Sequence, residues 1–289
     1  MSPPTCLLTF FSHFMKNLIL SLFPGIDLLG RGFESAGYDV VRGPDLLWGQ
    51  DICDYHAPAG AFEGIIGGPP CQDFSRARRS APSGDGDRGL VEFTRVVTEA
   101  RPDWFVLENV PGVPDVGVAG YRVQRLNLNA RECGCEQNRL RTFQFGSIDG
   151  IGIVIRRRER RPRAVTPCCM ASEGNRAGRR TWKEFVSAQG LPPDFDLPGW
   201  SLAMKYRAVG NGVPLPMGRV VAIAIQHRRV TAHQRVCVCG CGRPVEGNAI
   251  HGGAGCRKRM ERRRRVTPGV TLPRPVTPAA SHGACCKSS

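Results

Sequence analysis

Short apolar runs alternate with segments of helical spacing along the first third of the chain. Residues 17–23 (NLILSLF) are an apolar run that ends in Pro-Gly, and residues 27–37 carry apolar side chains at helical spacing. The alternation returns as an apolar run at 62–66, a helical pattern at 90–100 and an apolar run at 104–107. Strands that alternate with helices predict an α/β domain with a doubly wound parallel sheet, whose ligands collect at the carboxyl ends of the strands.

A glycine-bearing turn follows the first predicted strand. The sequence FPGIDLLGRG at 23–32 could bring backbone close to a nucleotide-like ligand, although any tight turn needs glycine. Asp45 follows a second predicted strand at 38–41, where a carboxylate can accept hydrogen bonds from ribose hydroxyls, and Asp51 comes shortly after. These acids favour a nucleotide pocket over a purely structural turn.

Cys71 stands behind two prolines in GGPPCQDFS, at 67–75. A packing cysteine needs no such rigid backbone, and the nearby metal-ligand types, Cys53 and His56, fall in a different loop. A nucleophilic thiol does need rigid presentation, together with surroundings that lower its pKa. We interpret Cys71 as a nucleophile, and the basic stretch SRARRSAPSGDGDRG at 75–89 as a mobile lid for a phosphate backbone.

Polar groups also stand in two later segments. Glu108 ends the apolar strand of WFVLENV, where burial should raise the pKa of its carboxyl and let it hold a proton for a ring nitrogen. Arg139 and Arg141 occupy alternate positions of QNRLR, so in a strand they would share one face. One or both could meet an anionic or carbonyl oxygen, and surface arginines are the alternative.

Taken in order, these motifs resemble those of the DNA cytosine-5 methyltransferase family, of phage or bacterial type. The matching stretches are FPG at 23–25, PPCQ at 69–72, ENV at 108–110, QNRLR at 137–141 and YRAVGNGVP at 206–214. The resemblance spans residues 17–226 and implies a Rossmann-like methyltransferase domain with S-adenosylmethionine as methyl donor. One departure is that Asp27 and Leu28 replace two glycines of the family's FxGxGG motif.

The resemblance also implies roles for individual residues. The Cys71 thiolate would attack carbon 6 of a cytosine, and Glu108 would contact N3 and the exocyclic amine. Arg139 would contact O2, with Arg141 as a further catalytic candidate. The residues expected at the cofactor are Phe23, Gly25, Asp45, Asp51, Pro70 and Asn211. The residues expected at the nucleic acid are Gln72, Ser75, Arg76, Arg78, Arg79 and Gln137.

The expected reaction transfers a methyl group to carbon 5 of a cytosine in DNA through a covalent Cys71 adduct. The base must be flipped out, because such chemistry cannot reach a stacked base. Two alternatives stay open: a tRNA cytosine-5 methyltransferase, since one branch of the family shares these motifs, and an inactive nucleic-acid-binding protein with the same fold. A compact enzyme with a short recognition region would suit a phage or bacterial element, and the sequence does not choose between roles in restriction, self-protection and regulation.

Shorter segments surround the expected catalytic and cofactor-binding core at 17–155, which ends in an apolar run expected as a strand at 151–155. Residues 1–16 are an extension of uncertain status, and charged or polar residues interrupt its apolar run, which argues against a membrane span. The other expected segments are a target-recognition region at 156–180, a return segment at 181–227, a basic Cys/His segment at 228–265 and a disordered tail at 266–289. So small a recognition region predicts a short or loosely specified site.

The chain carries 40 Lys and Arg against 25 Asp and Glu, a net charge of +15, which indicates a polyanionic partner. We expect double-stranded DNA as that partner, a monomer and no membrane association. We expect a cytoplasmic location, because the 13 cysteines show no disulfide spacing. Eleven basic and two acidic residues between 227 and 265 concentrate a charge of +9 there. The same segment predicts a zinc site from Cys237, Cys239, Cys241 and Cys256, with His251 as a substitute ligand; scattered thiols are the alternative.

Overall fold

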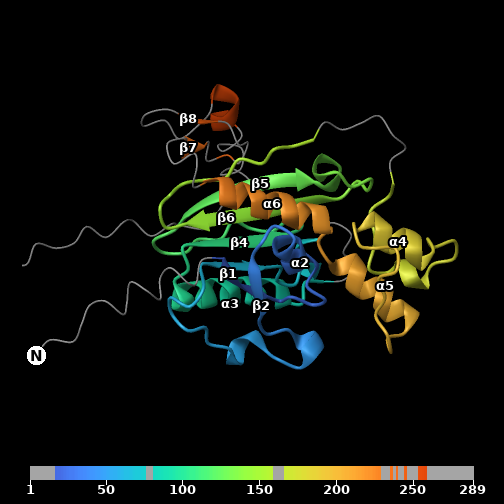
Figure 1. Ribbon diagram of the computed structural model, residues 1–289. Coiled ribbons are helices and arrows are strands. Elements are labelled where there is room, and N and C mark those ends of the chain that lie inside the picture. The colour runs from blue at the N-terminus through green and yellow to red at the C-terminus, as the bar shows by residue number, and fades with distance from the viewer. Residues whose placement is uncertain are drawn as a thin grey trace, which may run out of the picture.

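The computed structural model describes residues 17–75, 81–158, 166–228, 235–236, 239, 244–245 and 253–258. Six strands form one sheet in the order β2-β1-β3-β4-β6-β5, with helices on both faces (Figure 1). The parallel strands are β1 (Leu18–Leu22), β2 (Asp39–Arg42), β3 (Gly64–Gly67) and β4 (Trp104–Asn109). Each overlaps the apolar run that predicted it, which confirms the doubly wound arrangement.

The central strands are apolar on both faces because helices cover both. On β1, Ile19 joins the core with α2 (Leu28–Glu34) and α6 (Leu215–Arg228). The adjacent Leu20 joins the opposite core with α3 (Asp85–Ala100). Side chains alternate between the faces of a strand, so consecutive apolar residues are buried only where both faces are covered.

Two antiparallel strands extend the sheet beyond β4. β6 (Leu140–Ser147) pairs antiparallel with β4, and β5 (Arg122–Asn129) pairs antiparallel with β6. The sheet is therefore mixed, with a parallel half that carries the predicted pattern and an antiparallel half that the pattern did not predict. The expected strand at 151–155 is absent. There the Gln124 side chain bonds the backbone N–H and C=O of Ile153, at 2.8 and 3.0 Å.

Helices α2 and α6 touch through glycines. A Cβ on Gly32 would lie 2.8 Å from the Cα of Gly218, and one on Gly218 would lie 2.9 Å from the carbonyl oxygen of Leu29. Larger side chains would push the helices apart. This contact places the last described long helix beside the turn that follows β1.

A side lobe stands beside the sheet and contains α4 (Trp182–Ala188) and α5 (Leu202–Asn211) (Figure 1). Its core includes Phe185 and Tyr206, whose ring centroids are 4.5 Å apart. By length and composition, Leu202–Arg228 could cross a membrane, but 56% of its apolar window is buried inside the fold. Its hydropathy is explained by this burial, since α6 packs on α2 and the sheet.

Candidate active site

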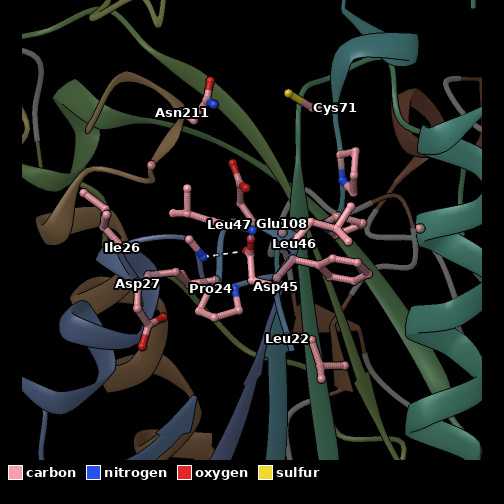
Figure 2. Close-up of a pocket in the computed structure, with 18 of the residues that line it drawn as sticks. Leu22, Pro24, Ile26, Asp27, Asp45, Leu46, Leu47, Cys71, Glu108 and Asn211 are labelled. Atoms are coloured by element: carbon pink, nitrogen blue, oxygen red, sulfur yellow. Dashed lines mark hydrogen bonds between the residues drawn. The ribbon is translucent and has the colours of Figure 1, made fainter. Parts of the chain in front are cut away.

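A cavity of about 740 Å³ opens at the carboxyl ends of β1, β3 and β4 (Figure 2). Stretches far apart in the sequence line it, from the turn after β1 to the turn between α5 and α6. The predicted site residues that line it are Phe23, Gly25, Asp45, Asp51, Pro70, Cys71, Gln72, Glu108, Arg141 and Asn211. The carboxyl edge of the parallel strands, where the strand pattern predicted a ligand site, therefore brings most of the predicted residues together.

The turn after β1 is shaped by residues in the left-handed backbone region. Gly25 has φ 56°, and Asp27 also has φ 56° and caps the N-terminus of α2. Its carboxylate accepts hydrogen bonds from Ser21 Oγ at 2.8 Å and Gly30 N at 3.0 Å. Aspartate tolerates this conformation better than most residues. Asp27 therefore has a left-handed backbone conformation that glycine adopts readily, at a position where the family motif has glycine.

Asp45 ties the turn after β2 to the turn after β1. Its Oδ2 accepts from Gly25 N at 2.7 Å, drawn as a dashed line in Figure 2, and its Oδ1 accepts from Leu47 N at 2.7 Å. A carboxylate has about four acceptor positions, so these bonds leave capacity for ribose hydroxyls. Leu46 and Leu47 also line the cavity and offer apolar surface for an aromatic base. The Asp45 carboxylate and the apolar lining together fit the ribose and the base of S-adenosylmethionine.

Asp51 lines the same cavity and is anchored by its neighbours. Its carboxylate accepts from Cys53 N at 3.0 Å and pairs with Arg88, whose Nη2 lies 3.1 Å from Oδ2. These contacts, led by the hydrogen bond from the Cys53 backbone, lower the pKa of Asp51. It is therefore a second charged acceptor beside the Asp45 turn.

Cys71 precedes the short 3₁₀ helix η3 (Gln72–Phe74) at the rim of the cavity (Figure 2). The prolines before it pack on α3: a Cβ on Gly89 would lie 2.9 Å from Pro70 Cδ and 3.0 Å from Pro69 Cβ. Asn109 adds a hydrogen bond from its side-chain nitrogen to Pro69 O, at 3.0 Å. The sequence argument missed Asn109 as a support of the nucleophile turn, although it belongs to the ENV stretch.

The thiol of Cys71 does not have the lowered pKa that its sequence context suggested. Burial raises its pKa, and the negative charge of Glu108 raises it further, while Arg141 and Arg139 oppose this effect. The correction has a tertiary cause, because burial of the thiol in the fold, followed by the nearby carboxylate, disfavours the charged thiolate. Cys71 is a thiol at rest, and formation of the thiolate is coupled to the groups around it.

Glu108 is buried at the end of β4, and burial raises the pKa of its carboxyl as predicted. Arg141 Nε lies 3.1 Å from Glu108 Oε1, and this oxygen has no hydrogen-bond partner among the described residues. Gly68 leaves room for the carboxylate, since a Cβ there would lie 3.2 Å from Oε2. Glu108 therefore has an acceptor, or a proton, to offer a group inside the cavity.

Arg139 does not line the cavity. Its predicted contact with the cytosine ring is therefore wrong in this structure, where its side chain supports the fold. Its guanidinium donates to the carbonyl oxygens of Cys169 at 2.8 Å, Gly210 at 2.9 Å and Gly212 at 2.9 Å. β6 begins at Leu140, so Arg139 lies just before the strand and Arg141 lies within it. Arg141 is the arginine that meets Glu108.

Gln137 is likewise placed inside the protein. It is fully buried, donates to Ala188 O at 2.6 Å and Gln189 Oε1 at 2.8 Å, and accepts from Cys169 N at 3.1 Å. These bonds leave it no access to a nucleic acid, which corrects its predicted role. Ser75 follows η3 and does not line the cavity.

Several predicted residues cannot be placed. Arg76, Arg78, Arg79, Cys237, Cys241 and His251 lie outside the described residues. Cys239 and Cys256 are both buried. Within the described part of the chain no group of three or more His, Cys, Asp or Glu could hold a metal ion. The zinc site thus gains no support and stays a prediction.

Comparisons with known proteins agree with this geometry. A family model for C-5 cytosine-specific DNA methylase matches residues 49–159. The chain is 30% identical over 172 residues to Type II methyltransferase M.HgiDI of Herpetosiphon aurantiacus, covering 45% of this chain and 52% of that protein. It is 35% identical over 162 residues to Type II methyltransferase M.HindV of Haemophilus influenzae, covering 45% of this chain and 53% of that protein. The chain therefore spans about half the length of these relatives.

Solved structures share the fold at much lower identity. Spodoptera frugiperda DNMT2 matches with a TM-score of 0.54 and 13% identity, over 73% of this chain and 100% of that chain. The Entamoeba histolytica methyltransferase EhMeth matches with a TM-score of 0.54 and 12% identity, over 73% of this chain and 97% of that chain. At these identities the likeness concerns the fold alone.

Proposed function

Because residues 49–159 match the family model for C-5 cytosine-specific DNA methylase, we propose that this chain transfers a methyl group from S-adenosylmethionine to carbon 5 of a cytosine in DNA. The observation that carries the proposal is the meeting of Cys71, Glu108 and Arg141 at one cavity that also contains the Asp45 turn. The thiol, acid and arginine suit addition to the cytosine ring, and the Asp45 turn suits a nucleoside cofactor. S-adenosylmethionine would supply an electrophilic methyl group there.

The chemistry follows from the weakness of carbon 5 as a nucleophile. The Cys71 thiolate adds to carbon 6, forming a C–S bond, and the displaced ring electrons reach the N3 side, where protonated Glu108 can give up its proton. Carbon 5 of this adduct is electron-rich and can accept the methyl group, with S-adenosylhomocysteine as the leaving group, and N3 then returns its proton to Glu108. Loss of the carbon 5 proton to a base then breaks the C–S bond, releases the thiolate and restores the aromatic ring.

Arg141 supports the acid in this scheme. Its guanidinium lies beside Glu108 and can also donate to the ring carbonyl oxygen at position 2, the role that the sequence argument gave to Arg139. A fixed donor inside a water-poor cavity stabilises charge that develops on that oxygen. Glu108 and Arg141 would thus contact neighbouring polar groups of the ring, N3 and the carbonyl oxygen at position 2.

DNA is the proposed substrate over RNA because the matching family model is that of a C-5 cytosine-specific DNA methylase. The net charge of +15 favours a polyanion but does not separate DNA from RNA. A tRNA substrate is the second candidate, because one branch of the family that the motifs resemble acts on tRNA. Incubation with labelled S-adenosylmethionine and either duplex DNA or tRNA separates them. Label in tRNA but not in DNA would overturn the DNA assignment.

A trapping experiment tests the reaction itself and separates it from nucleic-acid binding without catalysis. Duplex DNA containing 5-fluorocytosine should form a covalent complex with the wild-type chain in the presence of S-adenosylmethionine, because fluorine cannot leave as a proton does. Cys71→Ser should bind the same duplex without forming the complex. Cys53→Ser is a matched control, since Cys53 belongs to another turn. A wild-type chain that never forms the complex would contradict the proposed function.

A further inference from the structure

Asp73 bridges the nucleophile turn and the first turn of α3. Its Oδ1 accepts from Ser83 N at 2.8 Å, and its Oδ2 accepts from Gly84 N at 3.0 Å and Gly86 N at 2.9 Å. The Ser83 hydroxyl adds contacts at 3.3 and 3.4 Å. One side chain of the nucleophile turn therefore accepts hydrogen bonds from three backbone amides, all at least ten residues further along the chain.

Gly84 and Gly86, two of the residues whose amides bind Asp73, stand at the N-terminus of α3. Helix α3 begins after Gly84, and this glycine has no side chain to cap the helix. The first amides of a helix have no partner inside the helix, and a carboxylate is the preferred group to satisfy them. Asp73 supplies that cap from outside the helix, and these bonds lower the pKa of its carboxyl, so it stays charged.

The cap sits two residues from Cys71 and is reinforced by packing. Phe74 N donates to Cys71 O at 3.1 Å, closing the 3₁₀ turn that carries Asp73. A Cβ on Gly86 would lie 2.9 Å from the Phe74 ring, and a Cβ on Gly112 would lie 2.4 Å from Phe74 O. The turn is therefore held between α3 and the loop after β4, and Asp73 supplies its polar link to α3.

We propose that Asp73 is a positioning residue for the proposed methyl transfer: by capping α3 it fixes the 3₁₀ turn and holds the Cys71 sulfur at the cavity. The inference rests on the proposed function for its catalytic consequence, but the placement of the thiol is a property of the chain alone. Geometry of this kind matters because a small misplacement of a reacting group can slow a reaction roughly 100-fold.

The test compares Asp73→Ala, Asp73→Asn and the control Asp87→Ala. Asp87 is exposed in the same first turn of α3, so its removal takes the same charge from the same helix end. The first readout is the rate of covalent complex formation with 5-fluorocytosine DNA at saturating DNA and S-adenosylmethionine. Asp73→Ala should slow it roughly 10- to 100-fold. Asp73→Asn should restore part of the rate, because the amide oxygen still accepts, and Asp87→Ala should match wild type.

A second readout needs no substrate. Alkylation of Cys71 by iodoacetamide, followed by mass spectrometry of its peptide, should change severalfold in Asp73→Ala and not in Asp87→Ala. Affinity for S-adenosylhomocysteine should stay near wild type in all three variants, and the melting temperature of Asp73→Ala should fall by only about 2 to 4 °C, as expected for the loss of a helix cap. Equal alkylation in Asp73→Ala and wild type would overturn the inference, as would a loss of cofactor affinity as large as the loss of trapping rate. A wild-type chain that forms no complex would overturn the proposed function instead, and alkylation would still decide the role of Asp73.

Discussion

The guanidinium of Arg141 lies 3.1 Å from the carboxylate of Glu108, on adjacent antiparallel strands that meet at the cavity. Arg139, two residues earlier, binds backbone carbonyls of the side lobe and of the turn into α6 instead. Two arginines of one short motif thus serve different ends, and substitution can separate them.

Arg141→Ala should abolish most activity with little loss of stability. Arg139→Ala should first lower the stability of the fold, and any loss of activity should follow from that. Removing Arg139 leaves buried carbonyls without donors, each costing about 1 to 3 kcal/mol, so unfolding should occur at a clearly lower denaturant concentration. Arg141→Ala should slow adduct formation roughly 100-fold. Urea unfolding and 5-fluorocytosine trapping measure the two effects, and equal unfolding midpoints for the two variants would contradict the assignment.

Adduct formation should become faster from about pH 7 to pH 9. Burial and Glu108 raise the pKa of Cys71 above its ordinary value, so the thiolate is the minor form at neutral pH and rises about tenfold per pH unit below that pKa. Single-turnover trapping across this range measures the profile. A flat profile would mean that the thiolate is already formed at neutral pH.

Glu108→Gln should separate thiol reactivity from catalysis. Where Glu108 is ionised, the amide removes a negative charge that raises the pKa of Cys71, so alkylation of the thiol should be faster in that pH range. The amide cannot give a proton to N3, so methylation should fall roughly 100-fold or more. The two assays should therefore move in opposite directions, and a parallel fall in both would indicate a disrupted site.

Trp200 should contribute to cofactor affinity. Its ring lines the cavity and contacts Trp48, with centroids 5.9 Å apart, while Trp48 Nε1 donates to Gly25 O at 2.8 Å. This pair links the turn after β1 to the loop before α5. Trp200→Ala should weaken S-adenosylmethionine binding about 2- to 10-fold, as expected for an aromatic pair. Calorimetric titration measures it, with Leu202→Ala, exposed on α5, as the control.

The recognition sequence should be short or loosely specified. In the described part of the predicted recognition region, the backbone of Thr166 forms a β-bridge with Gln137, Cys169 is buried, and Arg180 pairs with Glu173 at 2.5 Å. The side chains of Cys169 and Arg180, which anchor the segment in this way, are unavailable for reading bases. Bisulfite sequencing of DNA from cells that express the chain gives the site, and a strict site of six or more base pairs would contradict this expectation.

Local sequence patterns determined the parallel half of the sheet and the order of its turns. Apolar runs at helical and strand spacing are set by the chain itself, and the glycines and prolines of the FPG and PPC turns mark where the runs end. Because parallel strands bring their carboxyl ends to one edge, residues as distant as Asp45, Cys71 and Glu108 could be assigned to one site.

Only the tertiary structure decided which of these groups reach the cavity and in what state. Arg141 rather than Arg139 pairs with Glu108 because carbonyls of the side lobe and of the turn into α6 hold the Arg139 guanidinium. The pKa of Cys71 depends on burial and on a carboxylate from another strand. Asp27 in a glycine conformation and Asp73 capping a helix from outside are likewise set by distant contacts. Sequence spacing fixes neighbours along the chain, whereas burial and charge depend on neighbours in space.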